Sequence, residues 1–136
     1  MGLVYENITL KNSGDVRDAR RGIIGELDVH QVDVQVIVDT GTEPLVFSEE
    51  IRQKLGLDIL RKKRVALADG VPKTCLITEP VEIYWKDRNT VVHGLVMEGI
   101  TEILLGTIPL EGMNLIVDPL NQRLVGAHGD IEIYRV

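Results

Sequence analysis

The chain has 136 residues, 44% of them hydrophobic, which is the size and composition of one globular domain with a single core. Its net charge of −6 argues against a nucleic acid as the main partner, and no apolar run approaches the ~20 residues that cross a bilayer. The single cysteine, Cys75, excludes an internal disulfide and, with no signal-type leader at the N-terminus, predicts a cytoplasmic protein. We therefore expect one domain over residues 1–136, with no membrane or nucleic-acid partner.

The first third of the chain alternates apolar strands with polar connections. Residues 3–10 predict a first strand, and the polar, glycine-containing stretch 11–22 predicts a loop. Two further strands are expected at 23–30 and 32–39. The run Val-Ile-Val at 36–38 has no polar alternation, so we expect this strand to be buried on both faces.

One short helix is expected in the middle of the chain. A strand at 44–48 precedes the stretch 48–57, where the hydrophobic period changes from strand-like to helical. Ser48 suits the N-cap of a helix, and Gly56 suits the position just after its last turn.

The second half of the chain predicts hairpins and short strands. Asp69-Gly70 lies between two apolar-rich runs in 63–77, which is a strong hairpin signal, and a second hairpin is expected around residues 87–89. An apolar strand, a helical turn and three more strands are expected at 102–106, 107–113, 114–118, 123–126 and 131–136, the last as a terminal edge strand. The whole pattern predicts an all-β domain with one or two short helices.

Asp39 ends an apolar strand and is followed at once by Thr40, Gly41 and Thr42. An ionised carboxylate buried at such a place is costly unless it is paired, shares a proton or binds a ligand. These four residues alone leave four interpretations open: a phosphate-binding turn of actin-like sugar kinases, the phosphorylated aspartate of ion-pumping ATPases, the catalytic aspartate of an aspartic protease, and an Asx turn without chemical function. The first two belong to much longer chains with further motifs that are missing from this sequence.

Three elements occur in the order found in retropepsin-like aspartic proteases. VIVDTG at 36–41 resembles their catalytic strand and loop, and VALADGVPKTCLI at 65–77 resembles their flap hairpin. ILLG at 103–106, followed by a short helix and LIVDP, resembles the strand that crosses behind the catalytic loop. The chain is therefore similar to the single-domain prokaryotic form of this family, most closely over residues 25–126. The resemblance implies a closed β-barrel with a flap, acting as an aspartic endopeptidase without a metal or other cofactor.

The resemblance also assigns roles to individual residues. It makes Asp39 the catalytic acid, Thr40, Gly41 and Thr42 the support of its loop, Asp69 and Gly70 the flap turn, and Leu104, Leu105 and Gly106 the strand that packs beneath the loop. The reaction needs two carboxylates that share a proton, and the chain contains one Asp-Thr-Gly. A homodimer with a two-fold axis would bring Asp39 next to Asp39 of a second copy. The partners expected are thus a second copy and a peptide or protein substrate.

Some positions depart from the family's pattern. Thr42 occupies a position that is more often Ala or Ser, while Glu43 and Thr107 replace an Asp and an Arg that pair in viral members. The second departure leaves dimer contacts of the viral type open. A module of the same fold that dimerises or binds peptides without useful turnover is the second interpretation. The basic runs 17–21 and 61–64 are interpreted as solvated surface, since charge runs usually are.

Overall fold

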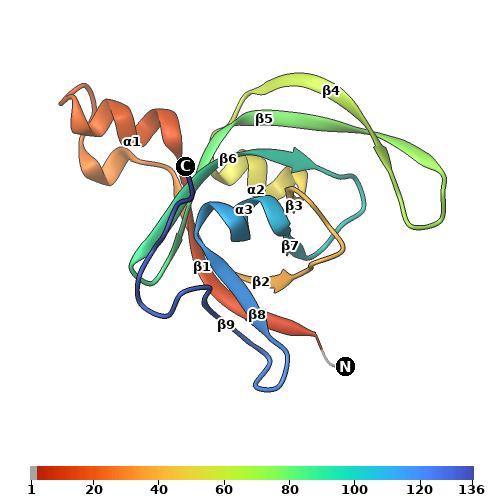
Figure 1. The fold of residues 1–136 in the computed structure, drawn as a ribbon. Coiled ribbons are helices and arrows are strands. Elements are labelled where there is room, and N and C mark those ends of the chain that lie inside the picture. The colour runs from red at the N-terminus through yellow and green to blue at the C-terminus, as the bar shows by residue number, and fades with distance from the viewer. Residues whose placement is uncertain (1–2) are drawn as a thin grey trace.

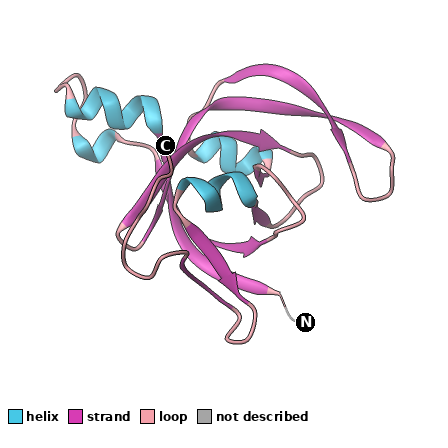
Figure 2. Ribbon diagram, in the orientation of Figure 1, coloured by secondary structure: helices cyan, strands magenta, loops and turns pink. Residues whose placement is uncertain are grey.

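A computed structural model describes residues 3–136 and has a mostly β architecture (Figures 1 and 2). Its strands are β1 (Val4–Asn12), β2 (Gln31–Val38), β3 (Leu45–Phe47), β4 (Ile59–Ala66), β5 (Pro72–Trp85), β6 (Arg88–Val96), β7 (Ile103–Leu105), β8 (Leu115–Asp118) and β9 (Arg123–Gly126). Its helices are α1 (Ser13–Arg20), α2 (Glu49–Lys54) and α3 (Thr107–Gly112), with one 3-10 turn, η1 (Glu26–Asp28). No helix within residues 3–136 is long and apolar enough to cross a membrane.

Six of the strands close into a barrel. They follow one another in the order β1-β2-β7-β3-β6-β5, and β1 also pairs with β5, which joins the two ends of the series. β4 continues the sheet beyond β5 and pairs with β5 alone, so its other edge is free within the described sheet. The predicted all-β class and closed barrel are thereby confirmed.

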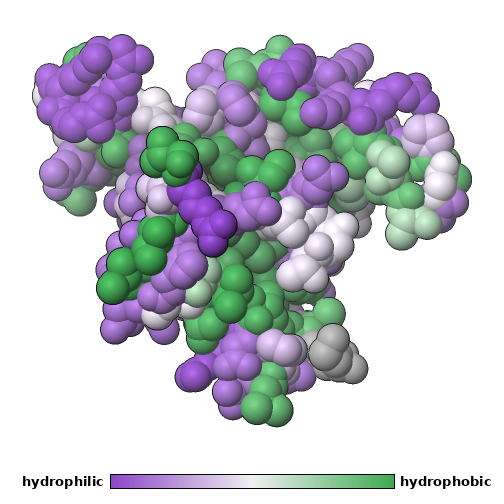
Figure 3. Space-filling view, viewed as in Figure 1, coloured by the Kyte–Doolittle hydropathy of each residue, from purple (hydrophilic) through white to green (hydrophobic). Residues whose placement is uncertain are grey.

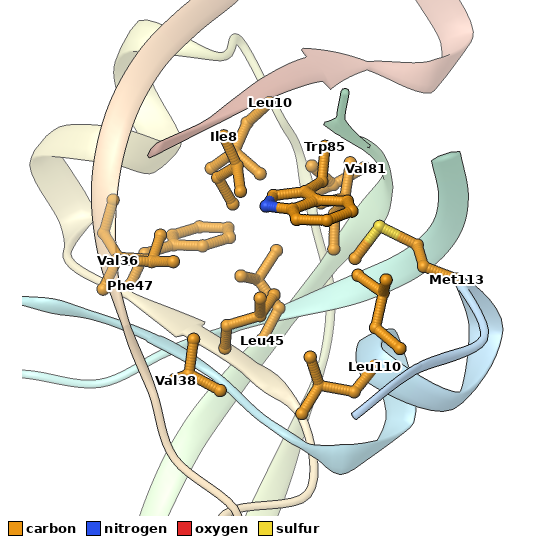
Figure 4. Packing of buried hydrophobic residues seen from close by; sticks show 14 of the residues in the cluster. Ile8, Leu10, Val36, Val38, Leu45, Phe47, Val81, Trp85, Leu110 and Met113 are labelled. Carbon is orange, nitrogen blue, oxygen red and sulfur yellow. The ribbon is translucent and has the colours of Figure 1, made fainter. Parts of the chain in front are cut away.

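The interior of the barrel holds one large apolar core (Figure 4). Phe47 and Leu45 of β3 and Leu10 of β1 are completely buried in it. The other side chains labelled in Figure 4 are Ile8, Val36, Val38, Val81, Trp85, Leu110 and Met113. Ile37, between Val36 and Val38, is only half-buried. The expectation of a strand buried on both faces is therefore wrong, because one face of β2 lines the core and the other lies at the barrel surface.

The stretch 11–22 contains helix α1 where a loop was expected, and this helix projects from the barrel (Figure 1). Its N-terminus is capped by Asn12, whose Oδ1 accepts a hydrogen bond from the Asp15 N–H at 3.1 Å. Asp15 lies in the first turn and Arg20 in the last, which suits the helix dipole. Local capping therefore makes a helix of a segment that has no buried side chain to reveal it.

Two expected strands are absent from the described chain. Residues 23–30 form a coil and η1, and they expose Ile23 and Leu27, so their apolar side chains have no sheet to join. Residues 131–136 are exposed and form no strand, although their pattern alternates. In a single chain this segment has no partner strand, and alternation alone does not supply one.

Other local predictions are confirmed. Ser48 caps α2 through its Oγ, and Gly56 follows the helix with a φ of +61°, as its predicted position after the last turn requires. β4 and β5 form the hairpin around Asp69-Gly70, with β5 running on into the barrel. The extra helix α1 brings the number of short α-helices in residues 3–136 to three.

Arg88 was expected in a turn but begins β6 and is only 3% exposed. Its Nη1 donates to the carbonyls of Met113 and Asn114 at 3.1 and 2.7 Å, and its Nη2 donates to that of Gly129 at 2.7 Å. The guanidinium thus ties the chain's C-terminal quarter to the barrel. No feature of the sequence around residue 88 distinguishes this arginine from an exposed one.

Candidate active site

The strand order explains where the segment 39–44 lies. β7 is parallel to β2 on one side and antiparallel to β3 on the other. The connection from β2 to β3 must therefore pass across the end of β7, where Gly106 follows Leu105. The Asp39 N–H donates to the Leu105 carbonyl at 3.0 Å, which carries the β2–β7 ladder one residue beyond the strand.

Three successive carbonyls of this connection bind the segment that follows β7. The carbonyl of Thr42 accepts from the Thr107 N–H at 2.8 Å, that of Glu43 from the Ile108 N–H at 2.9 Å, and that of Pro44 from the Gly106 N–H at 3.1 Å. The first N–H groups of a helix have no partner within the helix, so the loop supplies partners to the start of α3. The segments 42–44 and 106–108 therefore form one hydrogen-bonded unit.

Position 106 must be a glycine because this crossing leaves no room for a side chain. Its φ of −86° is one that any residue adopts, so conformational freedom is not the reason. A Cβ at this position would lie 2.4 Å from the carbonyl oxygens of both Glu43 and Pro44, closer than real Cβ atoms approach any atom. Both obstructing atoms belong to the backbone and cannot rotate away. Glycine here lets the loop lie directly on the end of β7.

The Asp39 carboxylate is half-buried and hydrogen-bonded within its own loop. Its Oδ1 accepts from the Gly41 N–H at 2.9 Å, and its Oδ2 accepts from the Thr42 hydroxyl at 2.8 Å. The first bond is an Asx turn, so that interpretation of the motif describes its local geometry. Each carboxylate oxygen accepts one of these two bonds and has two lone pairs, so each is able to accept a further bond. Full burial of Asp39, expected from the sequence, is not found in the single chain.

The other loop residues lie at the surface. Thr40 and Gly41 are exposed and Thr42 is half-buried. A Cβ on Gly41 would lie 3.3 Å from the Asp39 Oδ1, close enough to crowd the carboxylate. A larger side chain at residue 41 would thus stand beside the acid, while Thr40 is free to contact a molecule outside the chain.

Leu104 and Leu105 pack on opposite sides of β7. Leu105 is completely buried in the main core, whereas Leu104 packs against a second apolar cluster formed by Val46, Cys75, Ile77 and Leu95. Burial raises the pKa of the Cys75 thiol, so this cysteine behaves as an apolar side chain in the cluster.

The second cluster joins the β4–β5 hairpin to β7, the strand next to β2. Cys75 and Ile77 come from the hairpin, while Leu104 lies in register with Ile37 on the neighbouring strand. Asp39 follows Ile37 by two residues, so the two-residue period of a strand puts it on the same side of β2. The acid and the base of the hairpin therefore lie on the same outer side of the barrel.

The turn of the hairpin stands apart from the loop. Gly70 has a φ of +79°, and the Asp69 carboxylate accepts from the Val71 N–H at 2.9 Å, which closes the turn locally. Within residues 3–136 no hydrogen bond joins this turn to the segment 39–42. Figure 1 shows the hairpin arching out from the barrel as a projecting arm. The structure brings together the loop and 104–106, but not the flap turn.

Two surface hollows lie along β1 and β2. The first, which includes Ile37, is completed by residues of α2 and β7 and by residues 48 and 101–102, and the second by Tyr84 and Lys86. Neither includes Asp39 or its loop. Within residues 3–136 no three His, Cys, Asp or Glu side chains gather as metal ligands would.

Sequence reasoning missed the carbonyls of the 42–44 segment, which bind the start of α3. Backbone groups carry no residue-specific signal, but Gly106 after an apolar strand was a sign of close backbone approach. The basic run 61–64 is exposed, as expected of solvated surface, and it lies on the hairpin strand β4.

No family model matches the chain, and no curated protein matches it. Among solved structures, the chain is similar to a retropepsin-like aspartic protease from Rickettsia conorii. The two share 19% sequence identity over 87% of this chain and 89% of that chain, with a TM-score of 0.43. A likeness of this degree concerns the course of the backbone, and a function must be argued from the site itself.

Proposed function

We propose that the protein is an aspartic endopeptidase that works as a homodimer, with Asp39 of each copy forming the catalytic pair. The observation that carries this proposal is the placement of the Asp39 carboxylate. It stands on the outer side of β2 in a loop bonded to the end of β7, and both of its oxygens keep free acceptor positions. A rigid support of this kind is what a catalytic group needs for exact positioning.

A second copy is needed because one chain presents one such carboxylate. In a two-fold dimer the same surface meets itself, so an exposed residue on the axis approaches its own counterpart. Thr40 and Gly41 are exposed beside Asp39 and are available for such contacts. We assign Thr40 to a hydrogen bond with the partner's loop, which holds the two acids in register.

The proposed reaction uses the two carboxylates in different protonation states. Carboxylates about 3 Å apart cannot both be ionised, so the pair holds one proton. The ionised member takes a proton from a water molecule, which attacks the scissile carbonyl, while the protonated member donates to the carbonyl oxygen. The member that took the proton from water then donates it to the amide nitrogen, the C–N bond breaks and the amine leaves, and a hydroxyl proton of the intermediate returns to the other member as the acid product forms. The β4–β5 hairpin, with its Asp69-Gly70 turn, would close over an extended peptide.

The competing function, a non-catalytic dimerisation or peptide-binding module, shares the fold and the loop. The Asx turn at Asp39 would serve that module equally well. Only turnover separates the two functions, so the test must be an assay of cleavage.

The decisive comparison is wild type against Asp39→Asn on a mixed peptide library between about pH 4 and pH 8. Asn retains the acceptor oxygen for the Gly41 N–H, so the fold should survive while the proton chemistry is lost. We expect cleavage to fall by at least about a thousandfold, since members of a catalytic unit act together. Wild type should give a bell-shaped pH profile on the acidic side of neutral, because it needs a singly protonated pair.

Asp33→Asn is the matched control, because Asp33 is an exposed aspartate on the same strand whose carboxylate accepts only from Thr9 in the described chain. It should cleave as wild type does. Sedimentation equilibrium at micromolar concentration should give a dimer for all three proteins. Equal cleavage by wild type and Asp39→Asn, or activity in a strictly monomeric species, would refute the proposal.

A further inference from the structure

The β4–β5 hairpin carries a positive charge that the rest of the chain does not share. Residues 59–78, called here the basic hairpin, contain five lysines and arginines and one acid, so their formal charge is +4 and that of the rest is −10. The five cations are Arg61, Lys62, Lys63, Arg64 and Lys73. Figure 3 shows hydrophilic side chains along the outer margin of this projecting arm. A protein of net charge −6 thus carries a concentrated basic surface on this hairpin.

No acidic side chain among residues 3–136 forms an ion pair with these cations. The four residues on β4 are all exposed. The four ion pairs found in residues 3–136 involve other cations. Lys73 is held by a neutral group, since its Nζ donates to the Glu98 carbonyl at 3.0 Å. The basic hairpin therefore keeps its charge available for a partner.

The period of the strand divides these cations between two faces. Arg61 lies opposite Ile77 across the strand pair, and Lys63 lies opposite Cys75. Cross-strand partners point to the same face, and Ile77 and Cys75 point into the second apolar cluster. Arg61 and Lys63 therefore lie on the face of the hairpin that looks toward the side of Asp39.

Lys62 and Arg64 alternate with the first two cations and point to the opposite face. This alternation supplies a matched control within four residues. Lys62 and Arg64 have the same charge as Arg61 and Lys63 and lie on the same strand, but they face away from the second cluster.

The free edge of β4 offers a place for an extended chain. β4 pairs with β5 alone, so every second residue keeps an unpaired N–H and C=O along the outer edge. Extended peptides add to such edges through main-chain bonds. Lysines on edge strands also protect against unwanted pairing, and that alone would account for charge on β4. Protection of the edge would not make the hairpin favour one kind of peptide over another, whereas a binding surface would, so the two explanations predict different results.

We propose that the basic hairpin selects acidic polypeptide segments, whose carboxylates flank the scissile bond and pair with Arg61 and Lys63. This inference rests on the proposed function for the cleavage step, but not for the binding step. A peptide fits better than a nucleic acid because residues 59–78 contain no aromatic side chain on which a base could stack. The substrate class is then an extended, acidic stretch of a protein.

The test measures binding and cleavage separately. A fluorescent peptide with three carboxylates flanking an apolar centre is compared with a peptide in which each Glu is replaced by Gln. Binding is measured by anisotropy in an Asp39→Asn background, and cleavage in the active protein. Each measurement is made on the otherwise unchanged chain, on Arg61→Gln with Lys63→Gln, and on Lys62→Gln with Arg64→Gln.

We expect the acidic peptide to bind and to be cleaved about five- to tenfold better than its Gln counterpart at low salt, since each exposed pair contributes roughly 1.5- to 5-fold. Most of this preference should disappear in the Arg61/Lys63 variant and in about 0.5 M NaCl, where exposed charges are screened. The Lys62/Arg64 variant should keep at least half of it. The Gln peptide should respond little to either variant.

The outcomes separate this inference from the proposed function. Preferential binding without cleavage would refute the protease and leave the docking surface in place. Cleavage that depends on Asp39 but treats both peptides alike would refute the acidic specificity and leave the protease. If the two double variants lose the preference for the acidic peptide equally, the assignment of peptide binding to the face of Arg61 and Lys63 is refuted. Tighter binding of a single-stranded oligonucleotide than of the acidic peptide would overturn the choice of partner.

Discussion

Replacing Gly106 by Ala tests the crossing that positions Asp39. The added methyl group would lie 2.4 Å from two carbonyl oxygens, those of Glu43 and Pro44. Neither oxygen can move without shifting the loop, because both belong to the backbone. The substitution should therefore displace the loop from the end of β7 without altering the Asp39 side chain itself.

The expected cost follows from two contributions. Overfilling a packed site costs about 1–3 kcal/mol. Separating the loop from the 106–107 segment weakens the Gly106–Pro44 and Thr107–Thr42 hydrogen bonds, at about 1 kcal/mol each. Together they reduce the free energy of unfolding by about 3–5 kcal/mol, a large part of the ~5–15 kcal/mol of an ordinary domain. Gly14→Ala, in helix α1, is the control: its Cβ would lie 3.3 Å from the side-chain Oδ1 of Asn12, a contact that a small shift relieves, so the free energy of unfolding should change by less than about 1 kcal/mol.

Urea unfolding of the two variants and wild type measures this difference. Because Asp39 N–H bonds to Leu105 beside the crossing, cleavage by folded Gly106→Ala should also fall, by at least about tenfold if the acid is displaced by ~1 Å. A loss of stability below about 1 kcal/mol would refute the reasoning, since a contact at 2.4 Å with two fixed atoms cannot be relieved so cheaply.

Two further predictions concern the barrel. Arg88→Met keeps the apolar stem but removes a donor from three backbone carbonyls. The Asn114 carbonyl still accepts from the Ala127 N–H, while those of Met113 and Gly129 lose the one donor described for them, so urea unfolding should detect a loss of about 2–4 kcal/mol. A loss below about 1 kcal/mol would contradict this role of Arg88. Burial, reinforced by the hydrogen bond to Glu82, raises the pKa of Tyr84 to about 12. The folded state disfavours the Tyr84 phenolate, so the stability that the neutral phenol contributes is complete below about pH 10 and is lost as the pH rises toward 12. In an absorbance titration, Tyr84→Phe should lack the last tyrosine ionisation that wild type shows.

Much of the fold was predictable because its signals are local. Ser48 and Gly56 mark the ends of α2, and Asp69-Gly70 marks the hairpin turn, since each acts through its own backbone geometry. Errors arose where a local pattern lacked a tertiary partner. The alternating segment 131–136 forms no strand in the single chain, and residues 23–30 expose their apolar side chains instead of joining the sheet.

The candidate site divides in the same way. The sequence by itself determined that an acid follows an apolar strand, that small residues come directly after it, and that a glycine follows the apolar strand 103–105. Only the tertiary structure decided that β7 is inserted between β2 and β3, so that the loop must cross Gly106 and bond to the start of α3. It also decided that alternate cations of β4 face opposite sides of the hairpin arm. Strand order and register depend on contacts between residues far apart in the chain, and no local pattern of side chains encodes them.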